Sequence, residues 1–175
     1  MPVIMKMTGN FFLVGLPGAG KTTLGKMLAQ HISYDFIDAD VFLTERCGVD
    51  IPTIFALEGE QGFRTRETAI IEELTLRNNI VLATGGGAVL NPKNRHFLST
   101  RGTVIYLHAS AQELSKRVHL SRGRPLLQGD NQLQKLQDLY QTRDVLYREI
   151  ADYIVNVNND MCNETLQELF AVLGV

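Results

Sequence analysis

Short apolar runs alternate with helical periodicity along the chain. Runs with almost no polar interruption lie at 11–14, 36–37, 80–84, 104–107 and 153–157. Because strands that are covered on both faces lose the alternation of polar and apolar residues, these runs predict buried strands of a parallel sheet.

The segments between the runs carry apolar residues at steps of three and four, which is typical of helices. Pro92 favours a helix start, and Ser110 with Glu113 forms a capping-box pattern. Helices are predicted over 21–32, 91–98, 110–120, 132–149 and 162–173. The charged segment 40–76 is predicted to form several short helices, broken by Gly48, by Pro52 and by the glycines within 59–62.

Alternating strands and helices predict an α/β fold, a three-layer doubly wound sheet of five parallel strands. The 175 residues suit a single domain over 1–175. Ligands of open α/β sheets bind beyond the carboxyl ends of the strands, which directs attention to the residues from Gly15, Asp38 and Gly85 onward.

Composition narrows the function classes. The net charge is -2, with 45% hydrophobic and 21% charged residues. These values disfavour disorder and a protein that grips nucleic acid or a membrane surface. Cys47 and Cys162 form no metal-binding or disulfide pattern and suit a reducing compartment. The sequence shows neither the pattern of a secretory leader nor an apolar run long enough for a membrane span. We therefore expect a cytoplasmic protein without nucleic-acid or membrane partners.

The segment Gly15-Leu16-Pro17-Gly18-Ala19-Gly20-Lys21-Thr22 matches the phosphate-loop pattern GxxxxGK[ST] between a predicted strand and a predicted helix. Its backbone amides and the N-terminus of the following helix are suited to bind phosphate. Its lysine would contact the β- and γ-phosphates, and its threonine hydroxyl would bind Mg²⁺. A chance glycine-rich turn is the alternative. No guanine-reading NKxD segment is present, so ATP is favoured. The predicted ATP site comprises Gly18, Ala19, Gly20, Lys21, Thr22 and Thr23.

Four further motifs follow the phosphate loop. They are Asp38-Ala39-Asp40, the stretch from Glu60 to Glu67, Gly85-Gly86-Gly87 and Arg124-Pro125-Leu126-Leu127. In this order and spacing, from about 10 to about 157, the chain resembles the shikimate kinase family. The resemblance implies a P-loop NTPase fold of the nucleoside monophosphate kinase type, with a helical substrate-binding region at about 38–77 and a lid at about 119–131. It also implies transfer of the ATP γ-phosphate to the 3-hydroxyl of shikimate, with Mg²⁺.

The resemblance assigns roles to two carboxylates after the second strand. Asp38 is expected near Mg²⁺ through water, together with Thr22, and Asp40 on the acceptor hydroxyl. Alternate residues of an extended chain face opposite sides, which would separate the two roles. The alternative for Asp40 is that it caps a helix starting at Val41. The third strand ends in Ala83-Thr84 without an acid, so Asp38 is the candidate for the metal side.

The resemblance further assigns Arg64 and Arg143 to the shikimate carboxylate, with Glu67 holding the Arg64 guanidinium. A surface ion pair is the alternative for Arg64 and Glu67. The family pattern Arg-x-Pro-Leu-Tyr has Val145 in place of its proline here, which frees a backbone N–H and loosens φ.

Glycines and loop arginines complete the implied site. Gly85, Gly86 and Gly87 are expected to form the floor under shikimate, although a plain tight turn would use the same residues. Arg117 is expected at the adenine and Arg124, in the lid, at the transferring phosphate; a solvated surface position is the alternative for each.

Three other readings remain. Another small-metabolite kinase, such as gluconate kinase, differs only in its acceptor. A nucleoside monophosphate kinase lacks support because no base-reading segment is visible. A non-catalytic nucleotide-binding module predicts a lost catalytic residue, whereas Lys21, Asp40 and Arg124 are all present. The expected partners are therefore ATP and shikimate, bound by a monomer.

Overall fold

The computed structural model describes residues 9–118, 131–157 and 162–175. Its centre is a five-stranded sheet in the order β2-β3-β1-β4-β5, in which every neighbouring pair is parallel. The prediction of a five-stranded parallel sheet is confirmed. The strands are β1 (Asn10–Val14), β2 (Asp35–Asp38), β3 (Ile80–Ala83), β4 (Gly102–His108) and β5 (Tyr153–Asn156).

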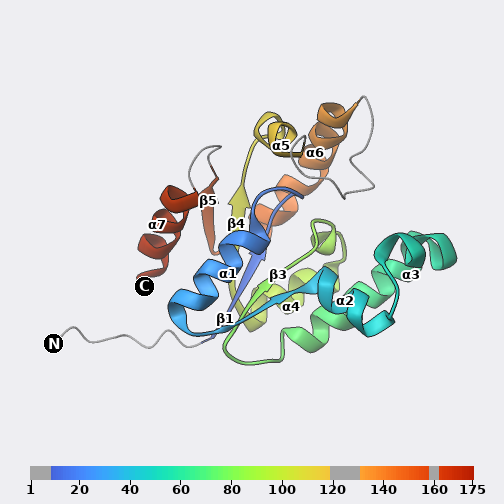
Figure 1. Cartoon of the computed structure of the whole chain (residues 1–175), viewed down its shortest axis with the longest axis horizontal. Helices are drawn as coiled ribbons and strands as arrows, with labels where there is room; N and C mark the ends of the chain where they lie inside the picture. The colour runs from blue at the N-terminus through green and yellow to red at the C-terminus, as the bar shows by residue number, and fades with distance from the viewer. Residues whose placement is uncertain (1–8, 119–130, 158–161) are drawn as a thin grey trace.

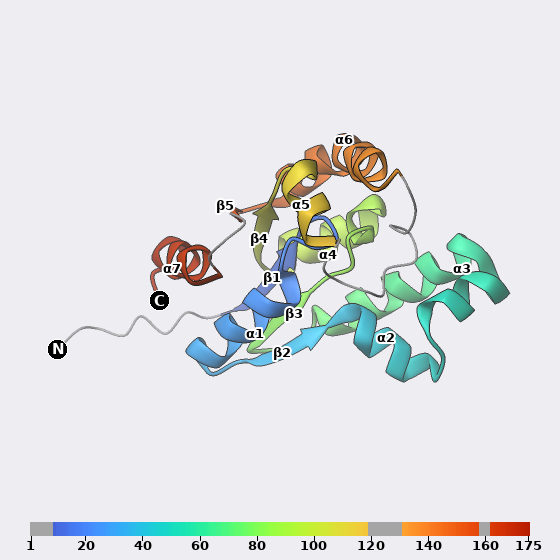
Figure 2. The ribbon, with the colours of Figure 1, turned by 45° about the horizontal axis from the view of Figure 1, so that its top comes forward.

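Helices cover both faces of the sheet, as the doubly wound prediction requires (Figures 1 and 2). α1 and α7 lie together on one face, while α3, α4 and α6 lie on the other. None of the helices in the described ranges is long and apolar enough to cross a bilayer. The helices are α1 (Lys21–Ile32), α2 (Ala39–Cys47), α3 (Ile51–Leu74), the 3-10 helix η1 (Ala88–Leu90), α4 (Pro92–Arg101), α5 (Ala111–Val118), α6 (Gln132–Ile150) and α7 (Cys162–Leu173).

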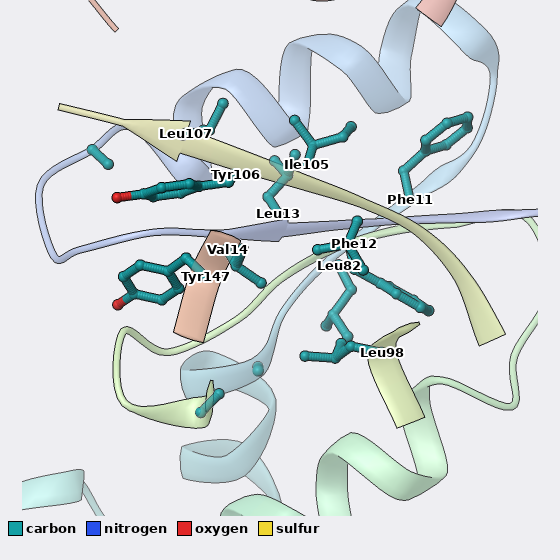
Figure 3. Close-up of a cluster of buried hydrophobic side chains, with 14 of the residues drawn as sticks. Phe11, Phe12, Leu13, Val14, Leu82, Leu98, Ile105, Tyr106, Leu107 and Tyr147 are labelled. Carbon is teal, nitrogen blue, oxygen red and sulfur yellow. The ribbon is translucent and has the colours of Figure 1, made fainter. Parts of the chain in front are cut away.

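The hydrophobic core follows the sheet on both sides. Leu13, Ile105 and Leu107 lie toward α1, whereas Phe12 and Leu82 lie on the opposite face (Figure 3). All five side chains have no exposed surface. This two-sided burial explains why β1 and β3 are almost wholly apolar, whereas the edge strands β2 and β5 are more exposed. The packed core holds the carboxyl ends of the strands in fixed relative positions.

The region after β2 follows the prediction of several short helices except at Pro52. The break at Gly48 separates α2 from α3. Gly59, with φ 71° and ψ -177°, is not helical, so two helical segments meet at a kink within the 24 residues of α3, as the glycines within 59–62 predicted. Pro52 does not interrupt α3, because a proline in the first turn needs no N–H partner, and Asp50 caps this start by accepting from the Thr53 amide at 2.9 Å. The long helix carries Arg64 and Glu67 toward the sheet.

The topology brings two loops together at the carboxyl edge of the sheet. β1 and β3 are neighbours, but the chain leaves β1 toward α1 on one face and leaves β3 toward α4 on the other. Such a divergence opens a crevice between two strand ends, where α/β proteins bind ligands. The loops that follow here are the phosphate loop at 15–22 and the glycine triplet at 85–87.

Candidate active site

The phosphate loop has a backbone that only glycine adopts easily at two key points. Gly15 has φ +152°, and a Cβ there would lie 2.7 Å from the Leu107 carbonyl oxygen of β4. Gly20 has φ +96° and is the N-cap residue of α1. The loop therefore packs closely on the sheet and turns its following amides outward at a helix N-terminus, an arrangement that suits phosphate.

Lys21 folds back over this loop. Its Nζ donates to the carbonyl oxygens of Gly15 at 2.7 Å and of Leu16 at 3.0 Å. The ammonium group is thus held over the concave side of the loop by neutral acceptors. An anionic phosphate oxygen is a stronger partner for an ammonium group than a carbonyl oxygen, so the arrangement is suited to exchange these bonds for phosphate.

Thr22 and Asp38 meet beside the loop. The Thr22 hydroxyl donates to Asp38 Oδ2 at 2.7 Å. The other Asp38 oxygen accepts from the backbone amides of Asp40 at 3.0 Å and Val41 at 3.2 Å, so Asp38 is the N-cap residue of α2. The expectation that Asp38 and Asp40 are alternate residues of one extended segment is wrong, because α2 begins at Ala39. The alternative, in which Asp40 caps the helix, does not hold either, because the cap residue is Asp38.

The Thr22–Asp38 pair fits a magnesium ion. Its two oxygens are hard ligands, and Mg²⁺ typically takes one or two protein oxygens together with phosphates and waters. Within residues 9–118, 131–157 and 162–175, no group of three or more His, Cys, Asp or Glu side chains is placed to hold a metal. The residues thus suit an ion that arrives with a nucleotide rather than one held by a protein cage.

Two carboxylates from different helices converge on Gly85. A Cβ at this glycine would lie 3.0 Å from Asp40 Oδ1 and 3.1 Å from Glu67 Oε2. The Glu67 side chain is only 4% exposed, and this burial raises its pKa. The guanidinium groups of Arg64 and Arg143 act in the opposite direction, while the nearby Asp40 carboxylate raises the Glu67 pKa further. Two acids and two arginines therefore share one half-buried space.

Arg64 lies along the glycine triplet. Its Nη1 is 2.9 Å from Glu67 Oε1, and its Nη2 is 3.5 Å from the exposed Glu60. The guanidinium occupies the space that a side chain at Gly87 would need, with Cζ 2.7 Å from the position of such a Cβ. Only glycine at position 87 leaves room for Arg64 in this pose. The side chain remains 21% exposed, so it is open to a ligand.

Arg143 reaches the same triplet from α6. It is 8% exposed, and its Nη1 lies 3.3 Å from the position of a Cβ at Gly86. The helix continues regularly through Val145, which is 63% exposed. The absence of a proline at this position therefore leaves the backbone around Arg143 helical. Arg64 on α3 and Arg143 on α6 flank the triplet, although they are 79 residues apart in the sequence.

The remaining predicted residues lie around the phosphate loop or outside the described part. Arg117 on α5 reaches the loop, with Nη1 3.4 Å from the Gly18 carbonyl oxygen. Thr23 is exposed in the first turn of α1, and Ala19 is buried beneath the loop. Arg124 and the predicted lid, apart from Asn131, lie outside the described residues.

Two residues of the site were not predicted. The Tyr147 hydroxyl donates to the Gly86 carbonyl oxygen at 2.5 Å, and Pro17 of the phosphate loop lies against Gly86, its Cδ 2.9 Å from the position of a Cβ there. Tyr147 follows Arg143 by four residues, so helical periodicity places both on one face of α6. That spacing was the available signal for Tyr147, whereas the Pro17 contact depends on the tertiary fold.

Comparison with known proteins agrees with this geometry. The family model for shikimate kinase matches residues 17–173. A shikimate kinase of Cupriavidus pinatubonensis is 52% identical over 164 residues, which cover 91% of this chain and 85% of that protein. The solved structure of shikimate kinase from Acinetobacter baumannii in complex with shikimate has a TM-score of 0.90 and 45% identity, and covers 97% of this chain and 95% of that one.

The fold extends to a more distant kinase. A gluconokinase from Sinorhizobium meliloti has a TM-score of 0.64 at 21% identity, a likeness of fold alone. By contrast, the shikimate kinase match spans both the phosphate loop from Pro17 and the acidic, arginine and glycine motifs that follow it. The chain belongs to the shikimate kinase family.

Proposed function

We propose that this protein transfers the γ-phosphate of ATP to the 3-hydroxyl of shikimate, giving ADP and shikimate 3-phosphate in the biosynthesis of chorismate and the aromatic amino acids. The observation that carries the proposal is the pair of arginines, Arg64 and Arg143, on either side of a glycine triplet whose Gly86 contacts the phosphate loop through Pro17. A carboxylated acceptor held there would present a hydroxyl beside the phosphate to be transferred. Family membership supports the same acceptor.

The nucleotide side of the proposal uses the residues of the phosphate loop. The amides of Gly18, Ala19, Gly20, Thr22 and Thr23 surround the phosphates, and Lys21 neutralises charge that spreads over the γ-phosphate oxygens during transfer. Thr22 would hold Mg²⁺ directly and Asp38 would hold it through water. When bound, the ion would supply positive charge that offsets the negative charge of the phosphates. Support for this pair comes from their contact at 2.7 Å.

The acceptor side divides binding from proton handling. Arg64 and Arg143 bind the carboxylate, because a guanidinium fork matches the two oxygens of a carboxyl group. Glu67 keeps the Arg64 fork in its pose through the contact at 2.9 Å. Gly85, Gly86 and Gly87 supply a floor without side chains. Asp40 accepts a hydrogen bond from the acceptor hydroxyl and orients it toward the phosphorus atom.

The reaction is a direct displacement. The hydroxyl oxygen forms a bond to the γ-phosphorus as the bond from that phosphorus to the bridging oxygen breaks, and ADP leaves with the electron pair. The hydroxyl proton passes to Asp40 late in the transfer, because the transition state is loose and little basicity is needed early. No phosphoenzyme forms. The outcome depends mainly on orientation, which the opposed helices α3 and α6 provide.

The lid and the assembly complete the proposal. Arg117 packs on the adenine, supported by its reach to Gly18. Arg124, in the lid at about 119–131, closes over the transferring phosphate and excludes water. Because Thr22, Asp40, Arg64 and Arg143 all come from one chain, a single-domain monomer over 1–175 suffices. We place the enzyme in the cytoplasm, where ATP is regenerated.

An acceptor comparison tests the proposed function. ADP release with ATP and Mg²⁺ is measured with shikimate, with gluconate and without acceptor. We expect release above the acceptor-free rate with shikimate only, because gluconate lacks the rigid ring that brings carboxylate and hydroxyl to fixed positions. Faster release with gluconate would indicate a gluconate kinase, and ATP binding without turnover on either compound would indicate a binding module.

A further inference from the structure

Tyr147 connects helix α6 to the glycine triplet. Its side chain has no exposed surface, and its hydroxyl donates to the Gly86 carbonyl oxygen at 2.5 Å. This is a contact between residues 61 positions apart in sequence. A buried hydroxyl needs a partner, so this bond to the half-buried Gly86 fixes the distance between the helix and the loop after β3.

The tyrosine ring is itself held in place. It packs against Tyr106 of β4 with ring centroids 4.9 Å apart, and both rings lie beside the carboxyl end of β1 (Figure 3). The Tyr106 hydroxyl donates instead to Asp144 Oδ1 at 2.7 Å, so it touches neither Tyr147 nor the glycine triplet, and the ring of Tyr147 is fixed by packing and burial. Tyr147 therefore has little freedom to follow a moving loop, and the loop is held to the helix instead.

The hydroxyl of Tyr147 remains a donor at neutral pH. Burial raises its pKa, and the neighbouring guanidinium of Arg143 opposes the rise only in part. Arg64 acts in the same direction as Arg143, while Asp144 adds to the rise. Tyr147 thus touches both the acceptor-side arginine and the glycine floor, whereas Gly86 contacts Pro17 on its other side.

We propose that Tyr147 is a positioning residue for the acceptor: by holding the Gly86 carbonyl and contacting Arg143, its hydroxyl sets the spacing between the arginine and the glycine floor. The proposal rests on the proposed function for its kinetic consequence, since it assumes that shikimate lies in this space. The structural consequence, a hydrogen bond that ties the glycine triplet to α6, does not depend on the substrate.

The test compares Tyr147→Phe with Tyr106→Phe. Each variant removes one buried hydroxyl from the same aromatic pair and keeps the ring. In Tyr106→Phe the abandoned acceptor, Asp144, keeps Arg148 at 2.8 Å, whereas in Tyr147→Phe the Gly86 carbonyl loses the Tyr147 hydroxyl as its donor. We expect Tyr147→Phe to raise the shikimate KM about five- to tenfold with little change in the ATP KM. Tyr106→Phe should leave the shikimate KM unchanged.

Amide hydrogen exchange gives a readout that needs no acceptor. The Ala88 amide donates to the Gly85 carbonyl at 3.1 Å, and the Leu90 amide donates to the Gly87 carbonyl at 3.1 Å. Both amides should exchange faster in Tyr147→Phe than in Tyr106→Phe at matched thermal stability. The positioning role would be overturned if the two variants had equal exchange rates at these amides. It would also be overturned if the wild type phosphorylated shikimate and the two variants had the same shikimate KM. A wild type that ignores shikimate would contradict the proposed function, while the exchange result would still decide the role of Tyr147.

Discussion

Replacing Lys21 with methionine is expected to lower kcat by at least about 10²- to 10³-fold while the fold is preserved. The size follows from the loss of a preorganised cation aimed at the charge that develops during phosphoryl transfer. Methionine keeps the length of the side chain, and the position is partly exposed, so packing changes little. The substitution also removes the bonds from Nζ to the Gly15 and Leu16 carbonyls. Steady-state kinetics with saturating shikimate and circular dichroism give the two readouts.

Lys26→Met is the matched control. Lys26 lies five residues further along α1, is exposed, and approaches the Phe36 ring at 5.9 Å instead of the phosphate loop. It loses the same charge from the same helix. Its kcat should remain within about twofold of the wild type, because a solvated charge contributes little to transfer. An active Lys21→Met variant, or an equal loss in both variants, would contradict the assignment of the phosphate loop as the catalytic nucleotide site.

Arg64→Ala is expected to raise the shikimate KM by about 10- to 100-fold and to leave the ATP KM nearly unchanged. Charge-assisted hydrogen bonds contribute about 1.5–3 kcal/mol, which corresponds to this range. Because Glu67 would then lie buried without its partner at 2.9 Å, some loss of thermal stability is expected as well. Arg64→Lys retains a positive charge beside Glu67 but not the planar fork, so its stability should recover more fully than its shikimate KM.

Arg66→Ala provides the control on the same helix. Arg66 is 45% exposed and binds Glu58 through Nε at 2.8 Å and Nη2 at 2.6 Å, away from the glycine triplet. An exposed pair of this kind is worth at most about 1 kcal/mol. The shikimate KM of Arg66→Ala should therefore match the wild type. If Arg64→Ala and Arg66→Ala had the same shikimate KM, Arg64 would not bind the acceptor carboxylate.

The centre of the sheet was predictable because β1, β3 and most of β4 are buried on both faces. Their sequences, which include Phe12, Leu82 and Leu107, are short apolar runs without polar alternation, and such runs are typical of buried strands. The segment 40–76 was harder, because proline and glycine are ambiguous signals. Pro52 starts a helix instead of ending one, whereas Gly59 does interrupt the helical backbone and leaves a kink within α3.

The acceptor side shows a second limit of sequence reasoning. Spacing alone predicts the contact between Arg64 and Glu67, since they are one helical turn apart. It does not predict that Asp40 and Glu67 meet at Gly85 or that Pro17 touches Gly86, because these contacts join separate elements. The Asp38 cap was missed for a local reason. α2 begins at Ala39, two residues before the start at Val41 that a cap at Asp40 implies, so the carboxylate that accepts the first amides is also the one beside Thr22.

The most direct measurement of the central claim is the destination of the γ-phosphate. The wild-type protein is incubated with ATP, Mg²⁺ and shikimate, and the products are identified by phosphorus and proton NMR. We predict one ADP for each phosphate transferred, with the phosphate on the 3-hydroxyl of shikimate and none on the protein. A phosphate found on another hydroxyl, attached to the protein, or released to water in place of transfer would contradict the arrangement of Asp40, Arg64 and Arg143 argued here.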